Sequence, residues 1–444
     1  MAYGTIDDLA DELVYGYWRS TFRRPASWTL DDERTLAVNL TGLDREASLR
    51  AKWALDVWSH YTGIDFDRVR VGGNIRFVEG EGSDAYAQRR QAGGELTKVR
   101  ITIGEDRLDG MAKFGDIGYI TILHELGHAL GLGHPGHYNG DARYFRDAIY
   151  RSDTVLRSAM SYFDADKDRS YSDRDLPPWL DPVTPMAADI RAIEMLYGSH
   201  DVNRGATIYN EHTFDTGIGG SRLRLSSSDL SQANLITLKD DGGHDLLEMT
   251  ALFGQRPGKH VIDLTPGAIS TVSSADAPVV FAIYETTIIE DVEGTRNADR
   301  ITGNAVDNKI RARNGEDVLR GEGGDDHLRG GKGADRLGGG TGNDILNGGP
   351  GDDVLFGGAG DDKLWGSNGE DTFVFRSARG EDVVMDFRND VDTLDLSRMG
   401  YENRREVRSQ AEEVEGGLRL GFEDGHGITL RGMTWEDLRD DILI

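Results

Sequence analysis

The sequence predicts an α+β domain followed by an all-β parallel β-roll. Two observations support this fold class. One is a helical run in which two histidines stand four residues apart and a third follows a glycine. The other is a nine-residue repeat rich in glycine and aspartate. The chain has 444 residues, which is enough for two or three domains.

Residues 1–30 are interpreted as an N-terminal segment. Residues 7–18 have the pattern of an amphipathic helix, and Arg23, Arg24 and Pro25 end it. We expect the first domain to occupy residues 31–200.

The first domain should mix strands and helices. Strands are predicted at residues 36–40, 74–78 and 99–103. A helix is predicted from Asp44 to about Tyr61, because its apolar residues form one stripe. Residues 79–95 are charged and contain glycine and serine, so we expect a loop there. A last helix is predicted over residues 186–196.

A metal site is predicted at the centre of this domain. Asp116 is a suitable N-cap for a helix that carries His124 and His128 on one face. Gly131 lets the chain turn sharply, which brings His134 back as a third nitrogen ligand. Three imidazoles with an open fourth position are typical of a catalytic zinc site. The alternative is a buried helix whose three histidines are satisfied by hydrogen bonds.

The full pattern H-E-x-x-H-x-x-G-x-x-H is the metzincin signature. Downstream lies Ser-Ala-Met-Ser-Tyr, in which Met160 matches the methionine turn under a metzincin zinc site and Tyr162 follows. With Pro135 after the third histidine, the chain resembles the serralysins, bacterial metzincins whose methionine-turn tyrosine is an additional zinc ligand. His137 departs from the family, where an acid is frequent, and we interpret it as a rim residue.

The resemblance implies a metzincin-type protease domain that hydrolyses peptide bonds in proteins. One catalytic zinc would be held by His124, His128, His134 and Tyr162. Glu125, which lies beside the two helical histidines, would deprotonate the zinc water and pass the proton to the leaving amine. Tyr162 would leave the zinc and hydrogen-bond the oxyanion.

The resemblance leaves two alternatives open. Because the family carries a short propeptide, residues 1–30 are either a propeptide remnant or an ordinary first helix packed on the domain. In metzincins the strand before the zinc helix is the sheet edge that binds the substrate backbone as an added strand. Residues 99–103 are therefore either that edge or a plain core strand.

Residues 201–293 contain strand-like runs, among them 223–225, and are expected to be a β-rich linking segment. Asp241-Gly242-Gly243-His244-Asp245 has the composition of an isolated calcium turn.

From Ala312 to Trp365, six nine-residue repeats follow one another without a gap. The eighth position is always leucine, the fourth always glycine and the sixth always aspartate. The glycines and aspartates are the candidate calcium-site residues: Gly315, Asp317, Gly324, Asp326, Gly333, Asp335, Gly342, Asp344, Gly351, Asp353, Gly360 and Asp362.

These repeats predict an RTX calcium β-roll over residues 294–375. Each leucine points inward from a short strand, so that stacked strands build a thin core. The glycines permit turns that other residues resist. The aspartates and backbone carbonyls can form oxygen cages for several structural Ca²⁺ ions, without which the stacked carboxylates repel. A flexible Gly/Asp linker is the alternative.

Residues 376–444 are expected to cap the roll. Residues 371–375, 382–387 and 392–396 resemble the end of the serralysin β-roll, and the closing residues 441–444 resemble its type I secretion signal. No N-terminal signal peptide and no apolar run of membrane-spanning length are visible. We therefore expect a secreted, extracellular bacterial protein, exported through its C-terminal signal.

The composition constrains the partners. A net charge of −28 and a pI of about 4.7 argue against nucleic acid or an anionic membrane. The absence of cysteine excludes disulfides and thiolate zinc sites. We expect a monomer without stable membrane insertion, with protein or peptide substrates, the type I secretion apparatus and a proteinaceous protease inhibitor as partners.

Two other functions compete with a protease. The first is a non-catalytic RTX adhesion or surface protein with a protease-like scaffold; the intact Glu125 argues against it, since a scaffold needs no base beside the zinc. The second is an RTX lipase, but the chain has no Gly-x-Ser-x-Gly elbow.

Overall fold

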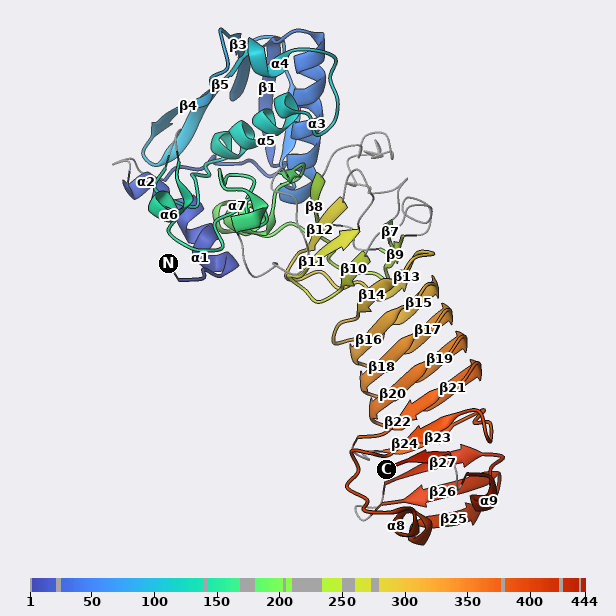
Figure 1. The fold of residues 1–444 in the computed structure, drawn as a ribbon. Helices are drawn as coiled ribbons and strands as arrows, with labels where there is room; N and C mark the ends of the chain where they lie inside the picture. Colours follow the sequence, from blue (N-terminus) through green and yellow to red (C-terminus); the bar gives the residue numbers. More distant parts are fainter. Residues whose placement is uncertain are drawn as a thin grey trace. The chain divides into compact units, whose positions relative to one another are not determined.

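The computed structural model describes residues 2–20, 25–138, 142–167, 180–202, 205–209, 234–249, 260–272, 279–376, 380–422, 426–438 and 441–444. The chain forms two compact units (Figure 1). The first comprises Met1–Arg204, His212–Asp241 and Asp276–Thr287, and the second Gly205–Glu211, Gly242–Ala275 and Ile288–Ile444. The linking segment expected at 201–293 is thus shared between the units. The strand expected at 223–225 lies outside the described residues.

A five-stranded sheet with the order β2-β1-β3-β5-β4 organises the first unit. Its strands are β1 (Thr35–Gly42), β2 (Asp65–Arg68), β3 (Ile75–Gly80), β4 (Ala85–Ala92) and β5 (Glu95–Gly104). Neighbouring strands run parallel except β4, which pairs antiparallel with β5. On one face of the sheet, Leu36, Val38, Phe77 and Ile101 are buried, so this face belongs to the core.

The structure decides one open alternative about this sheet and corrects one expectation. Residues 99–103 lie in β5, which is hydrogen-bonded to β3 and β4 and is therefore the plain core strand of the two alternatives. The loop expected over residues 79–95 is wrong, because Ala85–Ala92 form β4, an edge strand of the sheet. Two glycines with positive φ, Gly93 (+64°) and Gly94 (+94°), close the hairpin between β4 and β5. Polar residues occupy much of β4 because an edge strand buries little, and this hides the strand in the sequence.

Helices α3 (Arg45–Thr62) and α5 (Ile117–Ala129) and the short α4 (Glu105–Leu108) pack against this sheet (Figure 1). Helix α7 (Ala187–Tyr197) packs against α3, and α6 (Tyr144–Asp147) and the 3₁₀ helix η2 (Ala165–Lys167) are short turns. Asp44 caps α3 and Asp116 caps α5, each accepting a backbone N–H three residues on. Trp58 of α3 donates its indole N–H to the Leu123 carbonyl of α5 at 2.9 Å, which joins the two helices.

The N-terminal segment is part of the first unit. It forms α1 (Ile6–Asp11), the π-helix η1 (Glu12–Gly16) and α2 (Tyr17–Ser20), with Leu9, Leu13 and Val14 fully buried. The Ser152 hydroxyl donates to the Gly4 carbonyl at 2.7 Å, and Arg191 pairs with Asp7 at 2.7 Å. This packing favours the alternative of an ordinary first helix.

Three further strands of the first unit run parallel to one another. They are β6 (Asp181–Pro182), β8 (Asn234–Leu238) and β12 (Val279–Ile283), with β8 in the middle.

The second unit is a parallel β-roll, as the repeat predicts. One sheet stacks β14 (Asp299–Thr302), β16 (Val318–Gly323), β18 (Arg336–Thr341), β20 (Val354–Ala359), β22 (Thr372–Val374) and β24 (Thr393–Asp395). The other stacks β13 (Asp291–Glu293), β15 (Lys309–Asn314), β17 (His327–Lys332), β19 (Ile345–Pro350), β21 (Lys363–Asn368) and β23 (Glu381–Val384). Each coil uses two repeats, and equivalent leucines pair in register, Leu319 with Leu337 and Leu337 with Leu355. These leucines are buried and form the thin core.

Both ends of the roll carry added elements within the same unit. β7 (Ile208–Tyr209), β9 (Leu246–Glu248), β10 (His260–Asp263) and β11 (Ile269–Val272) precede the repeats, and α8 (Arg404–Ser409), β25 (Ala411–Val414), β26 (Gly417–Gly421), β27 (Gly427–Arg431), α9 (Trp435–Leu438) and β28 (Ile442–Leu443) follow them. The final strand β28 pairs in parallel with β24. Among the described residues, none of the helices is long and apolar enough to span a bilayer.

Candidate metal centre and active-site cleft

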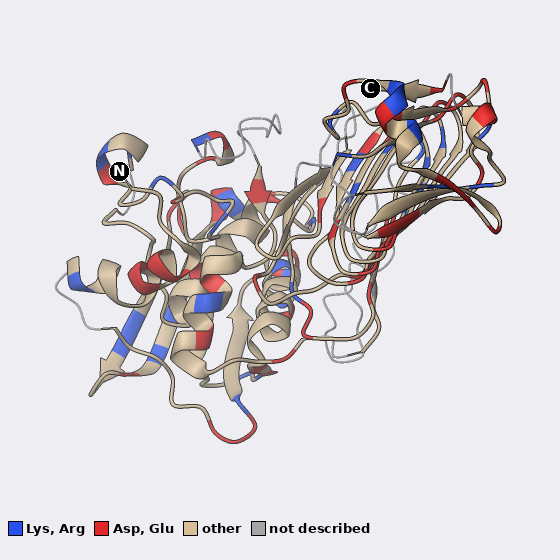
Figure 2. Cartoon of the chain, turned by 90° about the horizontal axis from the view of Figure 1, so that it is seen from below, with Lys and Arg blue, Asp and Glu red and all other residues tan. Residues whose placement is uncertain are grey.

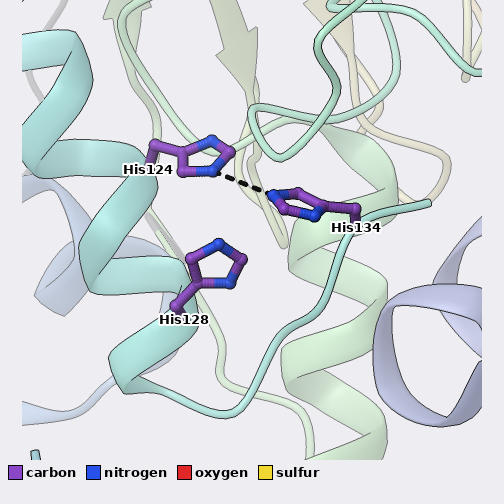
Figure 3. A group of neighbouring side chains, drawn as sticks. All are labelled: His124, His128 and His134. Carbon is purple, nitrogen blue, oxygen red and sulfur yellow. Dashed lines mark hydrogen bonds between the residues drawn. The ribbon is translucent and has the colours of Figure 1, made fainter. Parts of the chain in front are cut away.

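Three histidines converge at the end of helix α5 (Figure 3). His124 and His128 project from consecutive turns, and the chain leaves the helix through Gly131, whose φ of +109° is the left-handed region that glycine tolerates. The turn returns His134 to the same place. One nitrogen atom from each ring lies within 4.8 Å of the others, and this is the metal-binding group found among the described residues.

The hydrogen bonds of the three rings determine their tautomers. Each Nδ1 faces a backbone carbonyl: Ala159 for His124 at 2.9 Å, Leu132 for His128 at 2.9 Å and Tyr138 for His134 at 2.8 Å. A carbonyl only accepts, so each Nδ1 carries the proton and each Nε2 keeps a free lone pair. All three Nε2 atoms are therefore prepared as metal ligands.

The donor set fits zinc. The Nε2 atoms of His124 and His134 are 3.2 Å apart, and two lone pairs at that distance repel unless a cation lies between them. Zinc–nitrogen bonds of about 2.0–2.1 Å in a tetrahedron separate the ligand atoms by about 3.3 Å. Burial lowers the pKa of His124 to about 4 and that of His128 to about 3, so both rings are neutral at pH 7, as metal binding requires.

Glu125 is a buried acid beside this group. Only 6% of the residue is exposed, and its Oε2 atom finds no hydrogen-bond partner among the described residues. Burial raises the pKa of Glu125 to about 8, against the opposing effects of Arg107 and of a hydrogen bond with the Ala87 backbone of edge strand β4. A carboxyl group whose pKa lies near neutrality can both take and return a proton.

The methionine turn lies directly under helix α5. Met160 is fully buried, and a Cβ atom placed on Gly127 would meet its sulfur at 2.4 Å. Gly127 thus permits a close approach that another residue would prevent. Asp189 of α7 accepts hydrogen bonds from the Ser158 hydroxyl and the Ala159 N–H, both at 2.6 Å, and holds the turn in place.

Tyr162 follows the turn and reaches the metal-binding group. Its ring centre lies 4.7 Å from that of His134 and 5.6 Å from that of His124. Tyr162 is 40% exposed and lines a cleft of about 600 Å³ together with Glu125, His128 and residues of β4. His137 lies outside the group of three histidines; its half-exposed side chain is 3.9 Å from Glu12, consistent with a rim residue.

Sequence reasoning missed the contribution of the N-terminal segment. Trp18 donates its indole N–H to the Gly131 carbonyl at 2.9 Å, and the Tyr17 ring lies edge-on to His134 at 4.9 Å. Arg89 of β4 stacks on the Trp18 ring at 3.6 Å. The adjacent aromatic residues Tyr17 and Trp18 were the available signal. Only the fold places them beside the loop of residues 130–134 that carries His134, called here the ligand loop.

The roll holds the predicted calcium residues in two rows along its turns, where Figure 2 shows acidic residues gathered on successive coils. The six repeat glycines all have positive φ, from +98° to +145°. In each repeat aspartate, Oδ1 accepts a backbone N–H from the preceding coil, as Asp335 does from Asp317 at 2.8 Å. The Oδ2 atoms are buried and accept no hydrogen bond from described residues in Asp317, Asp326, Asp335, Asp344, Asp353 and Asp362.

These orphaned oxygens fit a hard cation. A buried carboxylate oxygen without a donor is costly, and Ca²⁺ binds such oxygens. Burial raises the pKa of all six carboxyl groups, to between about 6 and 8. The turn 241–245 is divided between the two units, and Asp245 accepts the Thr207 N–H at 2.7 Å.

Comparison with known proteins agrees with this geometry. The family model described as the RTX calcium-binding nonapeptide repeat (4 copies) matches residues 302–337 and 338–373. The chain is 27% identical over 274 residues to the metallopeptidase AprA of Pseudomonas marginalis, a match that covers 59% of this chain and 55% of the relative. It is 27% identical over 283 residues to the serralysin of Proteus mirabilis, covering 59% and 54%.

A further relative is serralysin G of Dickeya chrysanthemi, 32% identical over 199 residues, covering 44% of this chain and 38% of the relative. The chain thus spans about half the length of the first two relatives. A solved structure of high choriolytic enzyme 1, a hatching enzyme zinc-protease from Oryzias latipes, aligns at 17% identity over 39% of this chain and 96% of that chain, with a TM-score of 0.25, which is too low to support a fold argument. The predicted similarity to the serralysins is confirmed.

Proposed function

We propose that this chain, as a serralysin-like protein, is a zinc-dependent endopeptidase that hydrolyses peptide bonds in protein substrates. The observation that carries the proposal is Glu125. Its buried Oε2 has no hydrogen-bond partner among the described residues, and Glu125 lines the same cleft as His128 and Tyr162. A purely structural metal site needs neither an open cleft nor a buried base.

When bound at the three Nε2 atoms, zinc would supply a Lewis acid that polarises a carbonyl and acidifies water. The protein residues would do the rest. Glu125 takes a proton from the attacking water and returns it to the leaving nitrogen, and its raised pKa suits both steps. Tyr162 donates a hydrogen bond to the developing oxyanion. The free edge of β4 offers backbone groups to which an extended substrate can add as a further strand.

Casein digestion tests the activity. We expect digestion by the purified chain, loss of it after zinc chelation, and recovery when zinc is added back. Glu125→Gln should retain one zinc per chain and lose at least about 10³-fold in kcat/KM, since it removes the base. Glu81→Gln, at an exposed acid, is the matched control. Zinc-loaded protein that cleaves no peptide would instead support the rival, a non-catalytic RTX adhesion or surface protein.

Secretion is part of the same proposal. Calcium is scarce inside cells and abundant outside, so cages along the roll would fill after export and add folding free energy there. Residues 441–444 would act as the export signal, read before folding. In the folded chain Ile442 and Leu443 form β28, so a purely structural role is the competing interpretation.

Leu443→Ser separates the two interpretations, because Leu443 is 51% exposed and its loss should change stability little. We expect less protein in the medium at an unchanged melting temperature. If Leu443→Ser and a deletion of residues 441–444 each reduce export only as much as they lower the melting temperature, the tail is a structural part of the cap and not a signal.

A further inference from the structure

In one row of aspartates in the roll, the carboxylates at the C-terminal end have a different partner from those at the start. The row runs through Asp317, Asp335, Asp353, Asp371 and Asp392, and each N–H donates to the next Oδ1. In the first three residues Oδ2 is buried and accepts no hydrogen bond from described residues. In Asp371 it faces an arginine.

Arg388 supplies the positive charge at that end. Its Nη2 atom donates to the Asp392 Oδ1 atom at 2.9 Å and to the Gly369 carbonyl, and lies 3.4 Å from the Asp371 Oδ2 atom. The Arg388 backbone N–H donates to the Asp392 Oδ2 atom at 2.8 Å. The side chains of Asp371 and Asp392 are 0% and 1% exposed, so this ion pair is shielded on the carboxylate side.

The oxygens around Arg388 are equivalent to those of the preceding coil. β20 and β22 pair in register, Val354 with Thr372 and Leu355 with Phe373, which places Gly369 and Asp371 one coil after Gly351 and Asp353. The two glycines also share a backbone conformation, with φ of +142° and +145°. A repeat glycine carbonyl and carboxylates from successive coils therefore surround the guanidinium.

We propose that Arg388 is the built-in cation of a terminal cage formed by Gly369, Asp371 and Asp392, and that it takes the place of a calcium ion there. A guanidinium donates hydrogen bonds in fixed directions, carries a permanent charge and cannot dissociate from the chain. The last coil of this row thus has a positive charge beside its carboxylates at any calcium concentration, whereas the preceding cages depend on the ion.

Calcium stoichiometry of the full chain tests the proposal. Arg388→Ser opens the terminal cage, so equilibrium dialysis should find one more calcium ion per chain than in the wild type. The melting temperature of Arg388→Ser in chelator should fall, and saturating calcium should restore most of the difference. Arg388→Lys keeps a cation and should leave the stoichiometry unchanged. Arg320→Ser, at an exposed arginine on β16, is the control for loss of one positive charge.

A second pair of variants keeps the test decisive if Arg388→Ser folds poorly. Asp392→Asn lies only in the arginine cage and should not change the number of bound calcium ions. Asp353→Asn lies in a preceding cage and should lower it. An unchanged stoichiometry in folded Arg388→Ser, or an equal loss in Asp392→Asn and Asp353→Asn, would overturn the proposal and leave Arg388 as an ordinary ion pair.

Discussion

The Ser158 hydroxyl donates a 2.6 Å hydrogen bond to the buried carboxylate of Asp189, and this contact joins the methionine turn to helix α7. The same carboxylate accepts the backbone N–H groups of Ala159 and Met186. The carbonyl of Ala159 in turn accepts the Nδ1 proton of His124. Asp189 therefore positions a ligand of the metal-binding group without touching it.

Replacing Asp189 by alanine should weaken both folding and metal binding. Three buried donors would lose their acceptor, which we expect to lower the free energy of unfolding by about 3 kcal/mol. Zinc affinity should fall by about 10–100-fold, because the carbonyl that orients His124 loosens. Denaturant unfolding and a competitive zinc titration measure the two effects. Asp32→Ala, at an exposed acid, is the control, and a variant with wild-type zinc affinity would contradict the positioning role.

Gly127→Ala should displace Met160. The added Cβ would stand 2.4 Å from the methionine sulfur, a distance that the packed floor cannot accept without moving. Overpacking of this kind costs about 1–3 kcal/mol, so the melting temperature should drop together with kcat/KM. Gly205→Ala, where a Cβ meets nothing within 4 Å, should leave both unchanged. If Gly127→Ala and Gly205→Ala have the same melting temperature and the same kcat/KM, Met160 can move aside without cost.

Tyr162→Phe tests the proposed oxyanion donor. The ring would keep its place beside His134, while the hydroxyl is lost. We expect kcat to fall by about 10²-fold with a smaller change in KM, because the hydrogen bond is made mainly in the transition state. Steady-state kinetics on a peptide substrate measure this. Unchanged kcat would restrict Tyr162 to lining the cleft.

The calcium requirement of the roll should depend on pH. Burial raises the pKa of Asp317 from its ordinary value of 3.8 to about 8, and that of Asp326 to about 7. Between pH 3.8 and about pH 8, the calcium-free folded coil therefore binds more protons than the unfolded chain. Its stability should therefore increase as the pH falls from 8 towards 3.8, and be lost as the pH rises through 8.

Calcium binds the deprotonated carboxylates and displaces those protons. The increase in melting temperature that a fixed calcium concentration produces should thus be smaller at pH 6 than at pH 8, because protons and calcium compete for the same carboxylates. Melting curves in chelator and at that calcium concentration, recorded at both pH values, measure this difference. A calcium-induced shift in melting temperature that does not change with pH would show that the aspartates are already ionised in the calcium-free coil.

The spacing of residues along the chain was sufficient to predict features that lie within one helix or one repeat. The four-residue separation of His124 and His128, and the glycine before His134, predicted a convergence that the structure contains. The repeat predicted the roll because each coil buries its own leucines and pairs with its neighbouring coils. The nine-residue period is therefore enough to specify the fold.

Pairing between distant segments could not be predicted in this way. Strand β4 is polar because an edge buries little, and its place beside β5 depends on a hairpin and a sheet order that no local pattern encodes. The N-terminal aromatics Tyr17 and Trp18 read as the apolar side of an ordinary helix, yet they contact the ligand loop more than a hundred residues later in the chain.

The ligand types, their spacing and the coil of the roll follow from local sequence alone, because helical periodicity and a short repeat act over a few residues. Which aspartate oxygens are left without donors depends on the three-dimensional fold. Asp353 and Asp371 have the same local sequence position in their repeats, but of these two only Asp371 lies within reach of Arg388. The physical reason is that a charge is neutralised by whatever the fold brings within hydrogen-bond distance, and that distance in space is not encoded by distance along the chain.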